Sequence, residues 1–173
     1  MSKIKQLIHS EITNNIKNKD IIVISDNIRT PENIGMLFRI SEAFGVQKVF
    51  LVGNSPDLTN KKVLRTARKT EKKLIIKSVE KMQPLLDSLK KENYFLLGLE
   101  HTNTSKNIKK YNFSKHQKIV ILVGAERFGI EEETLKFLDN TIHIEMFGEN
   151  SSINVVNALG ICLYEITNLS NSN

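Results

Sequence analysis

The sequence predicts an α/β protein in which helices cover both faces of a mostly parallel sheet. Three observations lead to this fold class. Apolar segments of strand length alternate with helical segments along the 173 residues. The strand-like segments are continuous apolar runs, which is typical of strands buried on both faces. No repeat, long linker or low-complexity block interrupts the alternation, and the length suits one domain with a sizeable core.

Hydrophobic spacing assigns each element in turn. The chain is expected to open with an amphipathic helix, because Ile4, Leu7, Ile8 and Ile12 recur at helical spacing. The expected strands are short apolar runs that cover residues 21–25, 48–52, 74–77, 94–100, 118–124 and 141–145. The expected helices lie between and after them and cover residues 33–44, 79–92, 130–138 and 152–168.

Unusual residues follow four of the expected strands. They are "DNIRTPENIG" after the first strand, and "EHTNTS", "GAERFG" and "EMFGENSSIN" after the strands at 94–100, 118–124 and 141–145. Ligands of parallel sheets bind beyond the carboxyl ends of the strands. We therefore expect these four segments to build the functional site.

Composition and motifs exclude several classes of protein. The net charge of +6 is compatible with a nucleic-acid partner. A single cysteine, Cys162, forms no disulfide framework, and the four scattered histidines have no metal-ligand spacing. No leader and no apolar run of membrane-spanning length is found, so we expect a cytoplasmic, soluble protein without a membrane partner. Glycine-rich nucleotide fingerprints and the nucleophile elbow of hydrolases are absent.

An arginine lies inside the apolar helix expected at 33–44. Arg39 shares the narrow polar strip of that helix with Gly35 and Glu42. In one interpretation Arg39 is solvated and pairs with Glu42 three residues later. In the other, a ligand approaches the bare backbone at Gly35 and meets the five-donor guanidinium fork.

Two later segments allow a similar choice. Gly124, Glu126 and Gly129 in "LVGAERFGI" form either an ordinary turn or a site at a strand end. In "FGENSSINVVNALG" a serine is expected to cap the last helix, with Asn154 just inside it. Asparagine is unfavourable within a helix, and a polar ligand at the helix start would explain it.

The basic segment at 60–73 carries seven cations against one acid, Glu71. It is either a solvated face or a surface that contacts nucleic-acid phosphates, with an affinity that falls with salt. The cations are Lys61, Lys62, Arg65, Arg68, Lys69, Lys72 and Lys73.

Three blocks in this order resemble a known family. They are "NIGMLFR", "LVGAERFG" and "SINV" followed by a helix, and the similarity spans roughly residues 20 to 167. Together they resemble the SpoU/TrmH family of RNA ribose 2'-O-methyltransferases, in the SPOUT superfamily. The "LEHTN" segment is similar to a subgroup that acts on tRNA.

The resemblance implies a SPOUT fold with a C-terminal trefoil knot, S-adenosylmethionine (AdoMet) as cofactor and a homodimer, without a metal. It implies a catalytic set of Asn33, Arg39, Glu126, Ser152 and Asn154. The cofactor-binding positions that it implies are Leu99, Glu100, Gly124, Ile144, Met146 and Ile153. Glu145 stands where the family usually has proline, which leaves the conformation of that loop open.

Many family members carry an additional N-terminal RNA-binding domain. We expect residues 1–173 to be a single domain, with residues 1–19 as a helical extension and no separate RNA-binding domain. RNA would then be bound by Arg29, Lys61, Lys62, Arg65, Arg68 and Lys69. A tRNA substrate, methylated at a D-loop guanosine, is favoured. The alternatives are an rRNA substrate, a non-catalytic RNA-binding module of the same fold, and a generic small-molecule enzyme.

Overall fold

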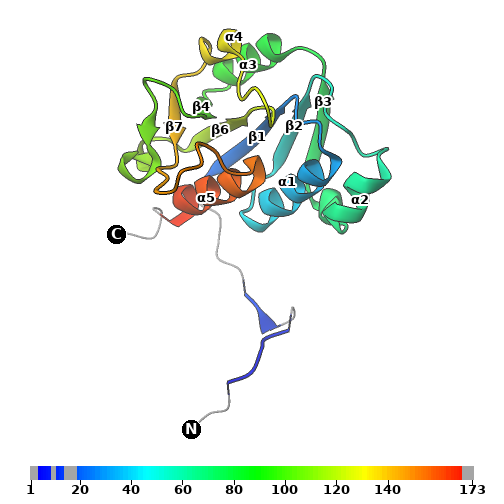
Figure 1. The fold of residues 1–173 in the computed structure, drawn as a ribbon. Helices are drawn as coiled ribbons and strands as arrows, with labels where there is room; N and C mark the ends of the chain where they lie inside the picture. Colours follow the sequence, from blue (N-terminus) through cyan, green and yellow to red (C-terminus); the bar gives the residue numbers. More distant parts are fainter. Residues whose placement is uncertain (1–3, 9–10, 14–18, 169–173) are drawn as a thin grey trace.

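Seven strands form one sheet in the computed structural model, which describes residues 4–8, 11–13 and 19–168 (Figure 1). Their order is β3-β2-β1-β6-β4-β7-β5, and every pairing between them is parallel. The predicted mostly parallel sheet is confirmed. The strands are β1 (Asp20–Asp26), β2 (Lys48–Val52), β3 (Ile75–Val79), β4 (Phe95–Leu99), β5 (Lys106–Asn107), β6 (Lys118–Val123) and β7 (Asn140–His143).

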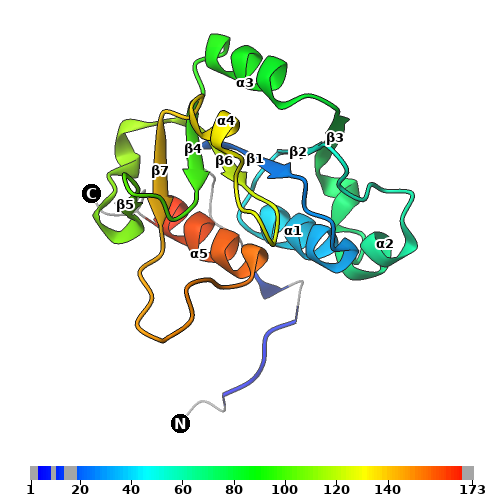
Figure 2. The ribbon, with the colours of Figure 1, turned by 45° about the horizontal axis from the view of Figure 1, so that its top comes forward.

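Helices cover both faces of the sheet, as expected. Figures 1 and 2 show α1, α2 and α5 on one face and α3 and α4 on the other. The helices are α1 (Pro31–Ala43), α2 (Lys61–Ala67), α3 (Met82–Lys91), α4 (Glu132–Leu135) and α5 (Val155–Asn168). Three short 3₁₀ helices lie within residues 19–168: η2 (Thr70–Lys73), η3 (Ile108–Lys110) and η4 (Phe113–Lys115).

Strand β1 lies inside the sheet, between β2 and β6, and contributes to both halves of the core. Ile21 and Val23 belong to the apolar cluster under α1 and α5, whereas Ile22 and Ile24 belong to the cluster under α3 and α4. Successive side chains of a strand point to opposite faces, so a strand covered on both faces is apolar at every position. This explains the uninterrupted run "IIVI".

The predicted amphipathic helix at the N-terminus is wrong for the residues that the structure describes. Residues 4–8 and 11–13 contain no α-helix, and the side chain of Ile4 is fully exposed. A helix of this length is marginal without an apolar surface to pack against. The other residues of the predicted 1–19 extension, except Lys19, lie outside the described part.

Several boundaries and two further elements also differ from the prediction. Strand β7 ends at His143 rather than at residue 145, and the chain continues as a loop to residue 154. Glu145 in this loop accepts a hydrogen bond from Asn107 Nδ2 at 2.8 Å, which ties the loop to β5. The short β5 and helix α2 were not predicted, because charged residues dominate both segments.

The glycine in the first block serves helix packing. Gly35 is buried in α1, and a Cβ atom there would lie 2.6 Å from Thr66 Cβ and 2.7 Å from the Val63 carbonyl oxygen of α2. The proposed bare surface for a ligand is therefore wrong. The missing side chain lets the backbones of α1 and α2 approach closely.

We predict that Gly35→Ala lowers the free energy of unfolding by about 1–3 kcal/mol, because the added methyl group forces α1 and α2 apart. Gly160→Ala is the matched control. In α5 the new Cβ would meet only the flexible end of Ile40, at 3.2 Å, and alanine favours a helix. Chemical denaturation of both variants measures the difference, and equal stability of the two would contradict this account of Gly35.

Candidate active site

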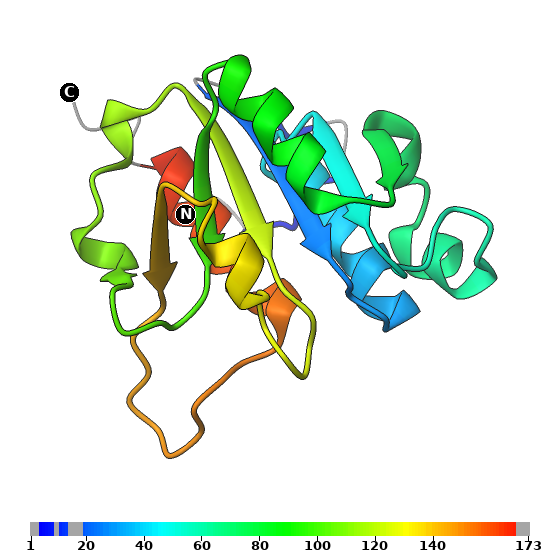
Figure 3. The same cartoon turned by 90° about the horizontal axis from the view of Figure 1, so that it is seen from above.

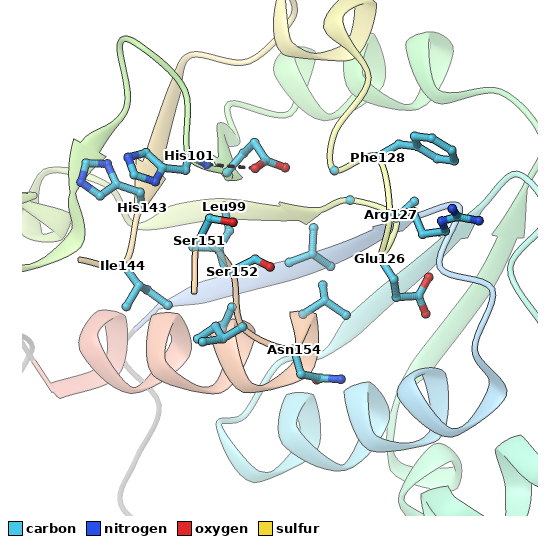
Figure 4. A pocket seen from close by; sticks show the side chains of 18 of the residues that line it. Leu99, His101, Glu126, Arg127, Phe128, His143, Ile144, Ser151, Ser152 and Asn154 are labelled. Atoms are coloured by element: carbon cyan, nitrogen blue, oxygen red, sulfur yellow. Dashed lines mark hydrogen bonds between the residues drawn. The ribbon is translucent and has the colours of Figure 1, made fainter. Parts of the chain in front are cut away.

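A cavity of about 440 Å³ lies beyond the carboxyl ends of β4, β6 and β7. In Figure 3 the strand arrows point toward the loops that frame it. The start of α5 closes one side. The lining residues are Leu99, Glu100, His101, Val123, Gly124, Ala125, Glu126, Arg127, Phe128, Gly129, His143, Ile144, Met146, Ser151, Ser152, Ile153, Asn154, Val155 and Ala158 (Figure 4).

The cavity gathers most of the residues that the sequence singled out. All six expected cofactor positions line it, as do Glu126, Ser152 and Asn154 of the expected catalytic set. The other two members, Asn33 and Arg39, lie on α1 and do not line the cavity. Asn33 reaches the cavity wall through hydrogen bonds with Glu126 and Asn154.

The Glu126 carboxylate lies at the N-terminus of α1. It accepts hydrogen bonds from the Arg29 and Thr30 N–H groups at 3.2 and 3.1 Å, and from Asn33 Nδ2 at 3.0 Å. Thr30, the N-cap residue, makes no side-chain cap of its own. A carboxylate from another loop therefore holds the segment that leads into α1, at the end of the helix where the dipole favours a negative charge.

These contacts decide the ionisation of Glu126. Burial alone raises the pKa of this carboxyl group. Hydrogen bonds from Asn33, from the Glu126 N–H group itself, and from Thr30 and Arg29 outweigh burial and lower the pKa to about 2. Glu126 is therefore an anion throughout the neutral range and holds its donors firmly.

The hydrogen bonds that begin at Glu126 continue from Asn33 to the start of α5. Asn154 Nδ2 donates to Asn33 Oδ1 at 3.1 Å, and Asn154 Oδ1 accepts from the N–H groups of Val156 and Asn157 at 2.9 and 3.4 Å. One hydrogen-bonded chain, Glu126–Asn33–Asn154, thus joins the three blocks of the sequence. It connects the start of α1 with the start of α5.

This arrangement corrects the expectations for the last helix. Helix α5 begins at Val155, so Asn154 lies before the helix and caps it. Ser151 and Ser152 do not act as the cap. Both are exposed on the cavity wall (Figure 4). The asparagine needs no ligand to explain it, and the two serine hydroxyl groups are available to one.

Arg39 is half-buried on α1, and its expected partner is occupied. Lys73 Nζ lies 2.9 Å from Glu42 Oε1, so the structure does not support the interpretation in which Arg39 pairs with Glu42. Within the described part of the chain, the hydrogen bond found for the Arg39 side chain is to Met36 Sδ, at 3.7 Å. The other guanidinium donors have no hydrogen-bond partner among the residues that the structure describes.

Two glycines and a glutamate build the hairpin that presents Glu126. The backbones of Ala125 and Gly129 exchange hydrogen bonds of 3.0 and 2.9 Å. A Cβ atom on Gly124 would overlap the Gly129 backbone. Gly129 adopts a φ of 64°, and a Cβ there would overlap the Glu100 carboxylate. The close packing favours the interpretation of this turn as part of a site.

Glu100, one of the expected cofactor positions, also contacts the neighbouring hairpin through its carboxylate. Its Oε2 accepts from the Ile130 N–H group and its Oε1 from the His101 N–H group, both at 3.0 Å. Both oxygens are thus engaged within the protein, and the carboxylate braces the 125–129 hairpin from the cavity wall. The binding of a cofactor by Glu100 stays a prediction.

Sequence reasoning missed the two histidines that line the cavity. His101 and His143 stack with ring centroids 4.5 Å apart and planes inclined by 17°. His143 Nδ1 lies 2.8 Å from Ser105 Oγ. Their positions in the sequence, shortly after β4 and at the end of β7, could have identified them as residues of the site. In residues 4–8, 11–13 and 19–168, no group of three or more histidine, cysteine or acidic residues could hold a metal ion.

A family model described as the SpoU rRNA methylase family matches residues 20–164. The chain belongs to this family. The match includes the three blocks that the hydrogen-bonded chain joins, and it confirms the family that the sequence suggested. Membership agrees with the parallel sheet and the site at its carboxyl edge.

Individual SpoU relatives differ in the RNA that their names give. This chain is 28% identical over 156 residues to the Saccharomyces cerevisiae tRNA (guanosine(18)-2'-O)-methyltransferase, covering 88% of this chain and 11% of the relative. It is 26% identical over 154 residues to the 23S rRNA (guanosine-2'-O-)-methyltransferase RlmB of Salmonella typhi, covering 87% of this chain and 60% of the relative. The chain thus spans less than two thirds of the length of these relatives.

A solved SpoU structure has the same fold. The SpoU methyltransferase AviRb from Streptomyces viridochromogenes, crystallised in complex with AdoMet, superposes with a TM-score of 0.81 at 22% identity. The superposition covers 92% of this chain and 61% of AviRb. The predicted SPOUT architecture is confirmed at the level of the sheet and its helices. The trefoil knot stays a prediction.

The predicted RNA-binding cations of this SpoU family member are all exposed. Arg29 lies beside Glu126, and the others lie on α2 or directly after it. Arg68 and Lys69 end α2 with φ angles of 53° and 70°, a left-handed conformation that is uncommon outside glycine.

No helix in the described part of the chain is long and apolar enough to cross a membrane.

A second carboxyl group near the site behaves in the opposite way to Glu126. Asp26 ends β1 and is 4% exposed. Burial, and next the negative charge of Glu131, raise its pKa to about 6, against the effect of a hydrogen bond from Asn27. Folding therefore shifts this carboxyl group toward its neutral form, which predominates below about pH 6.

We predict that Asp26→Asn raises the free energy of unfolding at pH 8. The folded-state pKa of Asp26 lies above its ordinary 3.8, so its contribution to stability is complete below pH 4 and is lost as the pH rises through 6. The variant should gain up to about 3 kcal/mol at pH 8, since one pKa unit is worth about 1.4 kcal/mol.

Denaturant titrations of wild type and Asp26→Asn at pH 4.5 and pH 8 measure this effect. The difference between the two proteins should shrink toward the lower pH. A gain in stability that is the same at both values would exclude Asp26 ionisation as its cause.

Proposed function

We propose that the protein is an AdoMet-dependent RNA 2'-O-ribose methyltransferase. The observation that carries the proposal is the hydrogen-bonded chain Glu126–Asn33–Asn154 at the wall of a cavity lined by every expected cofactor position. Family membership supports the reaction class, and the names of both relatives above specify 2'-O methylation of guanosine in RNA.

The cavity fits a cofactor of the size of AdoMet. Its volume of about 440 Å³ lies within the range of organic ligand sites. Leu99, Ile144 and Ile153 provide apolar contacts, and Gly124 leaves the backbone accessible. Ser151 and Ser152 add exposed hydroxyl groups for the polar end of a ligand. When bound, AdoMet supplies a methyl group on a sulfonium, ready for an in-line displacement.

In this reaction the protein places the ribose 2'-hydroxyl and stabilises charge on it. In the proposal, Arg39 stabilises the negative charge that develops on the 2'-oxygen and also binds an RNA phosphate. We propose this electrostatic role for Arg39 in preference to the role of a base, because guanidinium groups in general are poor bases. Asn33 and Asn154, fixed by Glu126, complete the pocket, and Ser152 orients the substrate.

RNA would be bound by the catalytic domain itself. Lys62 lies 3.9 Å from Glu32 in the first turn of α1, which brings the basic end of α2 close to the site. The proposed RNA contacts are Arg29, Lys61, Lys62, Arg65, Arg68 and Lys69, all exposed. This placement favours phosphate binding over a merely solvated face, within a single domain spanning residues 1–173.

The proposal includes a homodimer that works in the cytoplasm. Helices α1 and α5 lie side by side on one face of the sheet (Figure 2). They expose Met36, Ile161 and Tyr164 to 37%, 40% and 56%. An apolar strip of this kind suits burial against a second copy.

Among RNA substrates, tRNA is favoured, with a D-loop guanosine as target. The similarity to the yeast tRNA enzyme supports it, and the similarity to RlmB keeps rRNA as the alternative. Mass spectrometry of ribose methylation in tRNA and rRNA from a deletion strain distinguishes them. The affected RNA should lose one 2'-O-methylated nucleoside and regain it on complementation.

We predict AdoMet binding and methyl transfer. Calorimetry should detect one AdoMet per chain, and tritium from labelled AdoMet should appear in total RNA from the deletion strain. AdoMet binding without transfer to any RNA would favour the non-catalytic RNA-binding module. Failure to bind AdoMet would refute the enzyme proposal altogether.

We predict that Arg39→Ala abolishes methyl transfer and leaves AdoMet affinity largely intact. Arg39 does not line the cavity, whereas the proposed chemistry needs its charge at the reacting oxygen. Calorimetry and tritium transfer on the same preparation provide the two readouts. Loss of AdoMet binding in a folded Arg39→Ala protein would contradict this role.

A further inference from the structure

The hairpin that carries Glu126 also displays an arginine and a phenylalanine at its tip. Phe128 is 83% exposed and lies on the cavity rim. The Arg127 guanidinium lies 5.9 Å from the centre of the Phe128 ring. In Figure 4 both side chains point away from Ser151 and Ser152, which lie across the cavity. A large aromatic ring is thus presented to solvent beside the proposed reaction site.

This display is rigid. The Ala125–Gly129 backbone pair closes the hairpin directly beneath Arg127 and Phe128. The Glu100 carboxylate holds the following residue, Ile130, through its N–H group. The backbone of an aromatic side chain held in this way loses little freedom on binding, so contact with a flat ligand costs little conformational entropy.

The charges around the tip favour a polyanion on one side. Arg29, whose N–H group contacts Glu126, lies next to the hairpin, and Lys62 contacts Glu32 one turn away. An exposed basic path therefore leads from Arg127 across the start of α1 to α2. On the other face of the sheet the start of α4 carries three exposed acids, Glu131, Glu132 and Glu133. These would repel phosphates from that side.

We propose that the ring of Phe128 is a stacking platform for an unpaired nucleobase at the methylation site, with Arg127 bound to an adjacent phosphate. The inference rests on the proposed RNA methyltransferase function and assigns it a substrate-positioning residue. Proteins recognise single-stranded RNA by stacking splayed bases on aromatic rings and by following the backbone with cations. Both elements occur here on one rigid hairpin beside the cavity.

Exposed aromatic residues also occur without function, and the chain provides one for comparison. Phe147 is 93% exposed in the 144–154 loop, but it neither lines the cavity nor contacts an arginine in the part of the chain that the structure describes. Phe147→Ala is therefore a matched control for loss of an exposed ring. A general effect of exposed apolar surface would affect both variants equally.

The first test compares RNA and cofactor binding in four variants. Phe128→Ala and Phe128→Leu should raise the KM for deletion-strain RNA roughly 5- to 150-fold, the range expected for loss of one base–aromatic stack. AdoMet affinity should change far less, and Phe128→Trp should retain a KM near that of wild type. Phe147→Ala should leave the KM unchanged. An unchanged KM in Phe128→Ala, or an equal increase in Phe147→Ala, would overturn the assignment.

The second test does not depend on catalysis. The sequence contains no tryptophan, so Phe128→Trp carries a single indole. Stacking of a base on this indole should quench its fluorescence when total tRNA or total rRNA from the deletion strain is added. Saturable quenching supports the platform even if wild type transfers no methyl group. RNA binding without quenching would refute the platform and leave the methyltransferase proposal intact.

Discussion

The interaction on which the site depends is the Glu126 carboxylate at the start of α1. It accepts two backbone N–H groups of the 29–30 segment and the Asn33 amide, and Asn33 in turn accepts from Asn154, which caps α5. Two helices far apart in the sequence therefore share one polar anchor. The low pKa of Glu126 keeps this anchor charged at every physiological pH. Without the negative charge of Glu126, the hydrogen bonds that connect the starts of α1 and α5 through Asn33 would weaken.

Backbone approach at two places makes this anchor possible. Gly35 lets α1 pack against α2, and the Gly124–Gly129 contact closes the hairpin that carries Glu126. In both places a side chain would occupy space that another backbone already fills. The glycines of the first two blocks thus shape the protein, and the polar residues between them perform the proposed function. The spacing of each block places a glycine where the backbone must pack closely and a polar residue where the proposed function needs it.

The sequence predicted most of the fold because the strands are buried on both faces and their patterns are strong. The prediction of helices failed at Ile4 and its neighbours, where the apolar side chains do not pack against the rest of the protein. It also failed at α2, because the cations of this short helix obscure its apolar pattern. It identified Glu126, Asn33 and Asn154 through the resemblance, but pairings between distant loops do not follow from spacing. The engagement of Glu42 by Lys73 and the stacking of His101 on His143 are such tertiary facts.

The same contacts bear on how the proposed reaction removes a proton. Glu126 is a weak base, since three donors already occupy its carboxylate, and the proposal assigns Arg39 the role of a fixed positive charge. Neither group is suited to take the proton from a ribose hydroxyl at an early stage. A sulfonium is a reactive methyl donor, so the attacking oxygen can lose its proton late, to solvent. The protein's contribution is then alignment and a fixed positive charge, and both depend on a rigid start of α1.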